Sequence, residues 1–304
     1  MSGVMTGAMT GAVTGGATCG LLPDGRLHLQ HGPIDLVIGI DGTPRAVALA
    51  RRAAWERFRG LLGELVAELA LLRMPLRDEP PALRGPVACR MASACRPFRD
   101  RFITPMAAVA GAVADEVLAA MTAEAELERA YVNDGGDIAL HLAPGRSFAV
   151  GVVADLARPA VDGRLAVGHA DPIRGIATSG RRGRSLSFGI ADAVTVLAAD
   201  AAAADAAATM VANAVDAGHP AIRRMAASDL RDDTDLGDRP VTVEVGHLPA
   251  SVVREALDAG CRLAEYLYRR HLLFGAVLAL QGEFRVVGAP AAAVSADREK
   301  PAWV

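Results

Sequence analysis

One stretch, residues 192–216, constrains the fold more than any other part of the chain. Val194 and Val196 alternate with other residues in a β-branched segment, which predicts a buried strand. From about Ala201 the chain is rich in alanine and has no helix breaker before Gly218, which predicts a helix. A buried strand followed at once by a helix of small residues favours a sheet with helices packed closely against it.

Two polar residues on that predicted helix are candidates for a metal site. Asp205 and Thr209 lie four residues apart and therefore share one helix face. A carboxylate and a hydroxyl so placed offer two hard oxygens to Mg²⁺ or Ca²⁺. An isolated pair of this kind more often has a structural role, because Asp near a helix start complements the macrodipole and Thr often bonds back to a carbonyl one turn earlier.

Composition sets bounds on the class of protein. The chain has 304 residues, enough for one large domain or two closely joined ones. Its net charge of −3 provides no general attraction to nucleic acid. The four cysteines include no Cys-x-x-Cys pair, which favours reduced thiols in a cytoplasmic protein. We expect neither a membrane span nor a signal peptide, since acidic residues break the longest apolar run and residues 1–20 contain no Lys or Arg.

The remaining pattern predicts an α+β fold with mixed, largely antiparallel sheets and packed helices. Hairpins recur along the chain, and helices are expected over residues 44–72, 106–121 and 251–271 in addition to the alanine-rich one. We expect a single domain over residues 21–288 between two tails, residues 1–20 and 289–304.

Two segments have no clear periodicity. Residues 73–105 are rich in Pro and Arg and are interpreted as a long surface loop, although Arg96, Arg99 and Arg101 could also meet phosphate. Residues 228–238 contain five aspartates but lack the spacing of a calcium loop, which favours a solvated acidic loop.

Three motifs, in order along the chain, resemble those of the ApbE superfamily, whose characterised members are Mg²⁺-dependent flavin transferases. Residues 132–138, Val-Asn-Asp-Gly-Gly-Asp-Ile, are similar to its Val-Asn-x-Gly-Gly-Asp-Ile turn, and residues 177–180 match its Ala-Thr-Ser-Gly segment. Val194-Thr195-Val196, followed by Asp205 and Thr209, is similar to its metal motif. The resemblance covers roughly residues 103–215 and is strongest to a poorly characterised branch.

The resemblance implies a set of site residues. Asp205 and Thr209 would hold Mg²⁺ (or Ca²⁺), and a backbone carbonyl of Ala108 or Ala110 would complete the metal shell. FAD would be the substrate or ligand. The residues that would bind FAD belong to the first two motifs: Asn133, Gly135, Gly136 and Asp137 from the first, and Thr178, Ser179 and Gly180 from the second.

The chain also departs from the family pattern. Transferase members carry a lysine on the helix that here contains residues 107–112, and a histidine in the segment before Val194; this chain has neither. No catalytic residue is therefore assigned. Two functions stay open: a transferase acting on FAD or a related phosphate compound, with an acceptor protein as partner, and a non-catalytic flavin-binding or assembly protein. Self-association is also left open.

Overall fold

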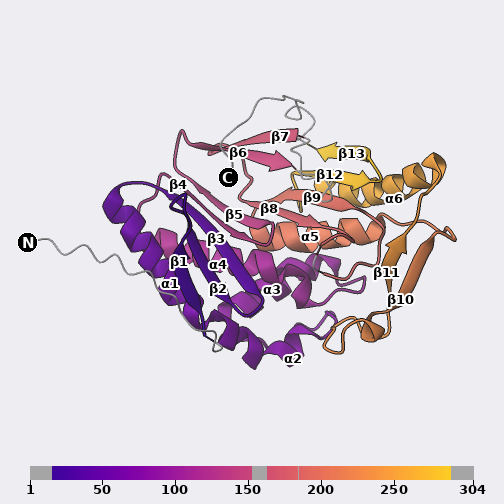
Figure 1. Cartoon of the computed structure of the whole chain (residues 1–304), viewed down its shortest axis with the longest axis horizontal. Coiled ribbons are helices and arrows are strands. Elements are labelled where there is room, and N and C mark those ends of the chain that lie inside the picture. Colours follow the sequence, from indigo (N-terminus) through magenta and orange to yellow (C-terminus); the bar gives the residue numbers. More distant parts are fainter. Residues whose placement is uncertain (1–15, 153–162, 184, 289–304) are drawn as a thin grey trace, which may run out of the picture.

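The computed structural model describes residues 16–152, 163–183 and 185–288 (Figure 1). In these residues, nine strands form one sheet in the order β1-β2-β3-β4-β5-β8-β9-β12-β13, and every neighbouring pair is antiparallel. The predicted α+β fold with a largely antiparallel sheet is confirmed. The strands of this sheet are β1 (Thr18–Leu21), β2 (Leu27–His31), β3 (Ile34–Asp41), β4 (Arg129–Asp134), β5 (Asp137–Leu142), β8 (Gly175–Ser179), β9 (Ala193–Ala198), β12 (Gly275–Leu280) and β13 (Glu283–Gly288).

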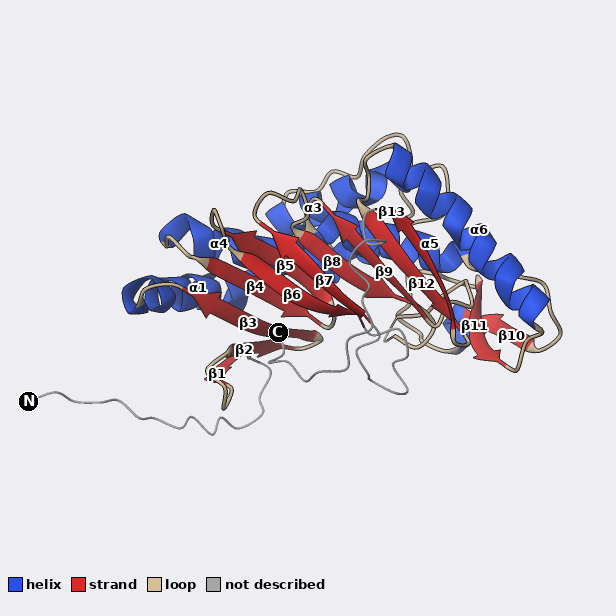
Figure 2. Cartoon of the chain, turned by 90° about the horizontal axis from the view of Figure 1, so that it is seen from above, coloured by secondary structure: helices blue, strands red, loops and turns tan. Residues whose placement is uncertain are grey.

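The helices lie on one face of this sheet, and the β6–β7 ribbon lies over the other (Figure 2). The helix face holds the main apolar core, whereas the ribbon encloses a smaller one around Tyr131, Leu140 and Phe148. A second two-stranded pair, β10–β11, is separate from the large sheet. These elements are α1 (Pro44–Ala67), α2 (Leu69–Leu72), α3 (Pro86–Cys95), α4 (Val109–Glu124), α5 (Ala201–Ala214), α6 (Ala250–Arg269), β6 (Ser147–Val152), β7 (Gly163–Gly168), β10 (Ile222–Ala226) and β11 (Pro240–Val245), with short 3₁₀ turns η1 (Arg96–Phe98), η2 (Pro105–Ala108) and η3 (Ala227–Asp229).

Helices α4 and α5 approach each other unusually closely. A Cβ added to Gly111 of α4 would lie 2.2 Å from the carbonyl oxygen of Ala201 at the start of α5. A Cβ on Gly175 of β8 would lie 2.0 Å from the carbonyl oxygen of Asp200, on the strand side of the same turn. The start of α5 is therefore held between α4 and β8 at backbone contact distance, which explains the need for small residues there.

Two local expectations were wrong, and one strand was not predicted. The predicted loop over residues 73–105 contains α3 and η1; Pro86 begins α3, and Val87, Ala88, Met91 and Cys95 bury one face of it. Residues 18–20, assigned to a tail, belong to β1, which pairs with β2. The strand β10 was not predicted. Residues 1–15 and 289–304 of the two predicted tails lie outside the described residues.

The stretch Pro105–Glu124, which comprises η2 and α4, is the one described helical segment long and apolar enough to cross a membrane. Half of its most apolar 18-residue stretch is buried inside the fold, where α4 packs against both α1 and α5. A place in the core accounts for its apolar character.

Candidate functional site

The β4–β5 hairpin brings together four of the predicted ligand-binding residues, Asn133, Gly135, Gly136 and Asp137, at one tight turn. Gly135 and Gly136 have φ angles of 63° and 113°, and Asn133 Oδ1 accepts a hydrogen bond from Gly136 N at 2.8 Å. Two successive positive φ angles match the twist of an antiparallel pair and are strained for any residue with a Cβ. The predicted turn is confirmed, and the Asn133 side chain is used to close it.

Two carboxylate side chains of this hairpin point to the helix side of the sheet. Val132 and Ala139 belong to the main core beneath the helices. Because side chains alternate along a strand, Asp134 on β4 and Asp137 on β5 point to that same side. Asp134 is also buried.

The Thr178–Thr195 pair lies on the opposite face. Ile176 and Leu197, two residues away on each strand, pack in the smaller core under the β6–β7 ribbon. The hydroxyls of Thr178 and Thr195 are 2.9 Å apart. The Thr178 backbone N–H donates to Asp137 Oδ1 at 3.2 Å. The structure thus ties Asp137 to β8 but turns the Thr178 hydroxyl away from the helices.

Two aspartates cap each other's helices where α4 and α5 meet. Asp205 Oδ2 on α5 accepts a hydrogen bond from Gly111 N in the first turn of α4, at 3.1 Å. Asp115 on α4 accepts from Ala201 N at 3.1 Å and Ala202 N at 2.9 Å, in the first turn of α5. Asp205 therefore has the structural role of a helix cap, as an isolated Asp often does. It caps the neighbouring helix α4 and not its own helix α5.

Asp205 also lies in a concentration of negative charge. Burial raises the pKa of Asp205 well above its usual range, and the charges of Asp137 and Asp134 raise it further, whereas the backbone N–H groups of Gly111 and Ala110 lower it. Burial together with the Asp205 charge also raises the pKa of the Cys95 thiol. A cation bound at Asp205 would offset the repulsion among these charges.

Thr209 differs from an ordinary helical threonine. Thr122 in α4 donates its hydroxyl to the carbonyls of Leu118 at 3.1 Å and Ala119 at 3.2 Å, as threonines in helices often do. No such bond engages the Thr209 hydroxyl within the described part of the chain, although Thr209 lies within α5 and is partly exposed. The Thr209 hydroxyl oxygen is therefore available to a ligand, and Asp205 lies one turn earlier on the same face of α5.

The atoms available as ligands determine which metal ion this site could hold. No cluster of three His, Cys, Asp or Glu side chains suited to a metal occurs among the described residues. A cation would instead take the Asp205 carboxylate, the Thr209 hydroxyl and backbone or ligand oxygens, which is the chemistry of Mg²⁺ and not of a thiolate or imidazole site. Ala110 presents its N–H to Asp205, and a helical carbonyl at that position points along α4 away from it, so Ala108 remains the backbone candidate.

The reciprocal cap predicts a pH dependence of stability. Burial raises the pKa of Asp115 to about 6, against the lowering effect of its two backbone hydrogen bonds. A carboxyl whose pKa is higher in the folded state stabilises the fold most when protonated, so the free energy of unfolding should fall by about 2 kcal/mol as pH rises from about 4 to 6. Urea unfolding across this range checks the slope, which Asp115→Asn should flatten; an unchanged slope in that variant would contradict the assignment.

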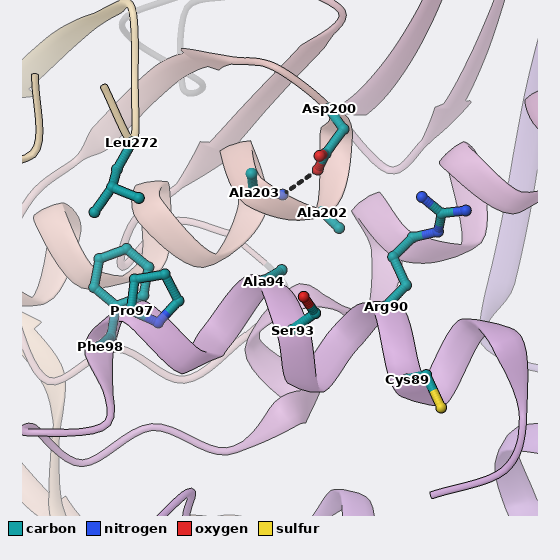
Figure 3. A pocket seen from close by; sticks show the side chains of 10 residues that line it. All are labelled: Cys89, Arg90, Ser93, Ala94, Pro97, Phe98, Asp200, Ala202, Ala203 and Leu272. Atoms are coloured by element: carbon teal, nitrogen blue, oxygen red, sulfur yellow. Dashed lines mark hydrogen bonds between the residues drawn. The ribbon is translucent and has the colours of Figure 1, made fainter. Parts of the chain in front are cut away.

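Two cavities of about 470 Å³ each lie away from Asp205 and Thr209. The first lies between α3 and the start of α5, with Cys89 and Arg90 at one end and Phe98 and Leu272 at the other (Figure 3). Asp200 caps α5 there by accepting from Ala203 N at 2.7 Å. The second cavity is lined by Arg181 and Arg182, which follow the Ala-Thr-Ser-Gly motif.

Other predicted residues are only partly brought together. Ser179 returns to the helix side at the end of β8 by strand alternation, and Gly180 (φ 153°) leaves no room for a Cβ, which would be 2.6 Å from the Asp192 carbonyl oxygen. The three arginines of residues 96–101 are exposed, and Arg99 pairs with Asp78 at 3.0 Å. They take no part in the site, which agrees with the surface interpretation.

Sequence reasoning missed Asp134, Cys95 and Asp115. Asp134 could have been found, because it lies two residues beyond the core residue Val132 on the same strand face. The proximity of Cys95 and Asp115 to α5 depends on helix packing and leaves no local pattern. The acidic loop is largely exposed, as predicted, but Asp235 is an exception because its carboxylate accepts a hydrogen bond from the buried Thr104 hydroxyl next to η2.

Comparison with known proteins agrees with these motifs. A model of the family described as AbpE bacteria matches residues 19–286. A UPF0280 protein of Methanothermobacter thermautotrophicus is 33% identical over 208 residues, which are 65% of this chain and 79% of that protein. A UPF0280 protein of Methanothrix thermoacetophila is 38% identical over 160 residues, 52% of this chain and 65% of that protein, so the chain spans less than two thirds of this relative.

Solved structures with a similar arrangement are distant in sequence. The apo form of the flavinyl transferase ApbE of Pseudomonas stutzeri is 14% identical, with a TM-score of 0.42 over 89% of this chain and 93% of that one. The flavin transferase ApbE of Vibrio cholerae is 12% identical, with a TM-score of 0.40 over 89% and 96%. The family match rests on sequence: the chain belongs to the AbpE bacteria family and, within the ApbE superfamily, to the poorly characterised branch that includes the UPF0280 proteins.

Proposed function

We propose that this protein binds FAD, or a closely related nucleotide with a pyrophosphate, through a divalent cation held by Asp205 and Thr209, and acts on that pyrophosphate as a flavin transferase. The observation that carries the proposal is the pairing of a carboxylate in excess negative charge with a helical hydroxyl that makes no back-bond. The family motifs that surround this pair support it. When bound, Mg²⁺ would neutralise pyrophosphate charge and make the leaving phosphate a better leaving group.

The protein's own residues would position the nucleotide. Gly135 and Gly136 let a ligand approach the hairpin backbone without a side chain in the way. Asp137 is oriented by the Thr178 N–H at 3.2 Å, which keeps its negative charge close to Asp205 and the proposed cation. The chemical consequence is a site that can bind and orient a phosphate-bearing ligand without further rearrangement of these elements.

A second candidate is binding without transfer. Transfer of FMN to a protein hydroxyl requires removal of a proton, and the segment between Gly180 and Val194, where transferase members carry a histidine, contains none in this chain. We expect calorimetry to detect FAD binding that requires Mg²⁺ in either case. Release of AMP from FAD, measured chromatographically with and without a threonine-containing acceptor, separates the two; absence of Mg²⁺-dependent FAD binding would contradict both.

Thr209 provides a direct test of the metal pair. Thr209→Val removes the hydroxyl and keeps the shape, and we expect a loss of about tenfold in Mg²⁺-dependent FAD affinity, which is about 1.4 kcal/mol. The matched control is Thr122→Val, which removes a helical hydroxyl that bonds to Leu118 and Ala119 and should leave FAD affinity unchanged. Titration calorimetry on both variants makes the comparison, and equal losses would count against a role for Thr209.

A further inference from the structure

The second cavity lies at the same end of the strands as the hairpin turn. Because neighbouring strands are antiparallel, the end of β8 at Ser179, the start of β9 at Ala193 and the end of β12 at Leu280 lie side by side. The cavity opens there and has a volume of about 470 Å³. We call it the arginine cavity; its lining residues are Arg181, Arg182, Val245, Gly246, His247, Leu248, Ala250, Val253, Gln281 and Glu283.

A buried carboxylate fixes the arginines that line it. Asp192 is 6% exposed. Its Oδ1 accepts from Arg181 at 2.6 Å and forms an ion pair with Arg182 Nε at 3.1 Å, and its Oδ2 accepts from Gln281 N at 2.6 Å. The Arg181 side chain is only 17% exposed, and its Nε is buried without a hydrogen-bond partner among the described residues. Asp192 thus holds two guanidinium groups in place at the wall of the cavity, where an anionic ligand could accept hydrogen bonds from them.

Gln281 fixes another part of the cavity lining. This residue has a φ of 47°, which is strained for a residue with a side chain. Its Oε1 accepts from Leu248 N at 3.1 Å and its Nε2 donates to Gly246 O at 2.7 Å. The side chain thus joins the β12–β13 turn to the segment before α6, and the cavity is preorganised and not formed by loose loops.

The remaining lining has both charge and apolar surface. Helix α6 begins at Ala250, and its N-cap Pro249 contributes no side-chain cap, so the first turn adds partial positive charge to that of the arginines. Val245, Leu248 and Val253 form an apolar side. The one acidic residue in the lining, Glu283, lies 3.8 Å from Arg285.

We propose that the arginine cavity binds a phosphate group carried on an apolar or aromatic body, as in a nucleoside monophosphate. Arg181 would donate to the phosphate, and the apolar side would receive the base, which matches the mixed lining of small-molecule sites. This goes beyond the flavin site, because it uses neither Asp205 nor Thr209 and requires no divalent cation.

The experiment is titration calorimetry in EDTA with three probes: AMP, adenosine and inorganic phosphate. We expect AMP to bind at least about tenfold more tightly than adenosine, because only AMP offers an acceptor to Arg181. Arg181→Gln should weaken AMP binding at least about tenfold. Arg223→Gln is the matched control, since Arg223 pairs with Glu244 on the exposed β10–β11 ribbon and should leave binding unchanged.

A second variant keeps the test valid if Arg181→Gln fails to fold. Ala250→Glu places a negative charge at the cavity on an exposed first-turn position, where acidic residues favour the helix. It should weaken AMP binding about tenfold without lowering the thermal unfolding temperature. Asp205→Asn should leave metal-free AMP binding unchanged. The proposal is overturned if AMP binds no better than adenosine, if Ala250→Glu binds AMP like the unaltered protein, or if Asp205→Asn removes the binding.

Discussion

Asp205→Asn should weaken Mg²⁺-dependent FAD binding by about 100-fold or more, which is about 3 kcal/mol. The substitution keeps the size of the side chain and retains an oxygen that can accept from Gly111 N, which donates to it at 3.1 Å. It removes the charge that makes Asp205 a ligand for a hard cation beside Asp137 and Asp134. Calorimetric titration of FAD with and without Mg²⁺ measures the difference.

The chain contains a matched control for this variant. Asp115→Asn removes the other half of the reciprocal cap, a carboxylate that also accepts from backbone N–H groups in the first turn of a neighbouring helix. Both variants keep an oxygen for the cap and remove a charge that burial disfavours, so neither should be less stable than the unaltered protein near neutral pH. Only Asp205→Asn should lose FAD affinity. If the two variants lose it equally, Asp205 acts through helix packing and the proposed metal site is wrong.

Gly111→Ala should cause the largest loss of stability among single substitutions on α4. Its Cβ would lie 2.2 Å from Ala201 O and 2.4 Å from Ala201 C, and backbone atoms cannot move away as a flexible side chain would. We expect a loss of at least about 3 kcal/mol in the free energy of unfolding, because α4 and α5 would have to separate at their closest point. Such a separation would also lengthen the Gly111–Asp205 hydrogen bond, so FAD binding should fall with stability.

Gly63→Ala is the matched control and should have the opposite sign. Gly63 also lies inside a helix, α1, but a Cβ there would meet nothing within 4 Å. Alanine in an exposed helix position is favoured over glycine by about 1 kcal/mol, so this variant should be more stable. Chemical denaturation of both variants gives the two values. A Gly111→Ala protein as stable as the unaltered one would contradict the close approach of the two helices.

Much of the fold could be predicted because local patterns determine it. The helix expected from residue 44 does begin there, where Pro44 is its first residue and Thr43 Oγ1 accepts from Ala46 N at 3.2 Å. The Gly135-Gly136 pair predicts a tight hairpin turn, which both positive φ angles confirm. The alternation around Val194 predicts a buried strand, and β9 is buried along its whole length. Each of these depends on a few neighbouring residues.

Features that depend on tertiary contacts could not be predicted. The predicted helix through Leu72 is interrupted at Glu68, whose carboxylate accepts from Arg84 N at 2.7 Å and Gly85 N at 2.8 Å before α3. The reciprocal caps of α4 and α5 join residues 86 to 94 positions apart in the chain. Sequence spacing also could not reveal that Thr178 and Asp205 lie on opposite faces of the sheet.

The most direct measurement is the position of a Mn²⁺ ion, used in place of Mg²⁺, in crystals grown with FAD. Anomalous diffraction should place the ion about 2 Å from an Asp205 carboxylate oxygen and from Thr209 Oγ1, on the helix side of the Asn133–Asp137 turn, with pyrophosphate oxygens completing its shell. An ion bound elsewhere, or FAD bound with no ion between these two side chains at saturating Mn²⁺, would contradict the account.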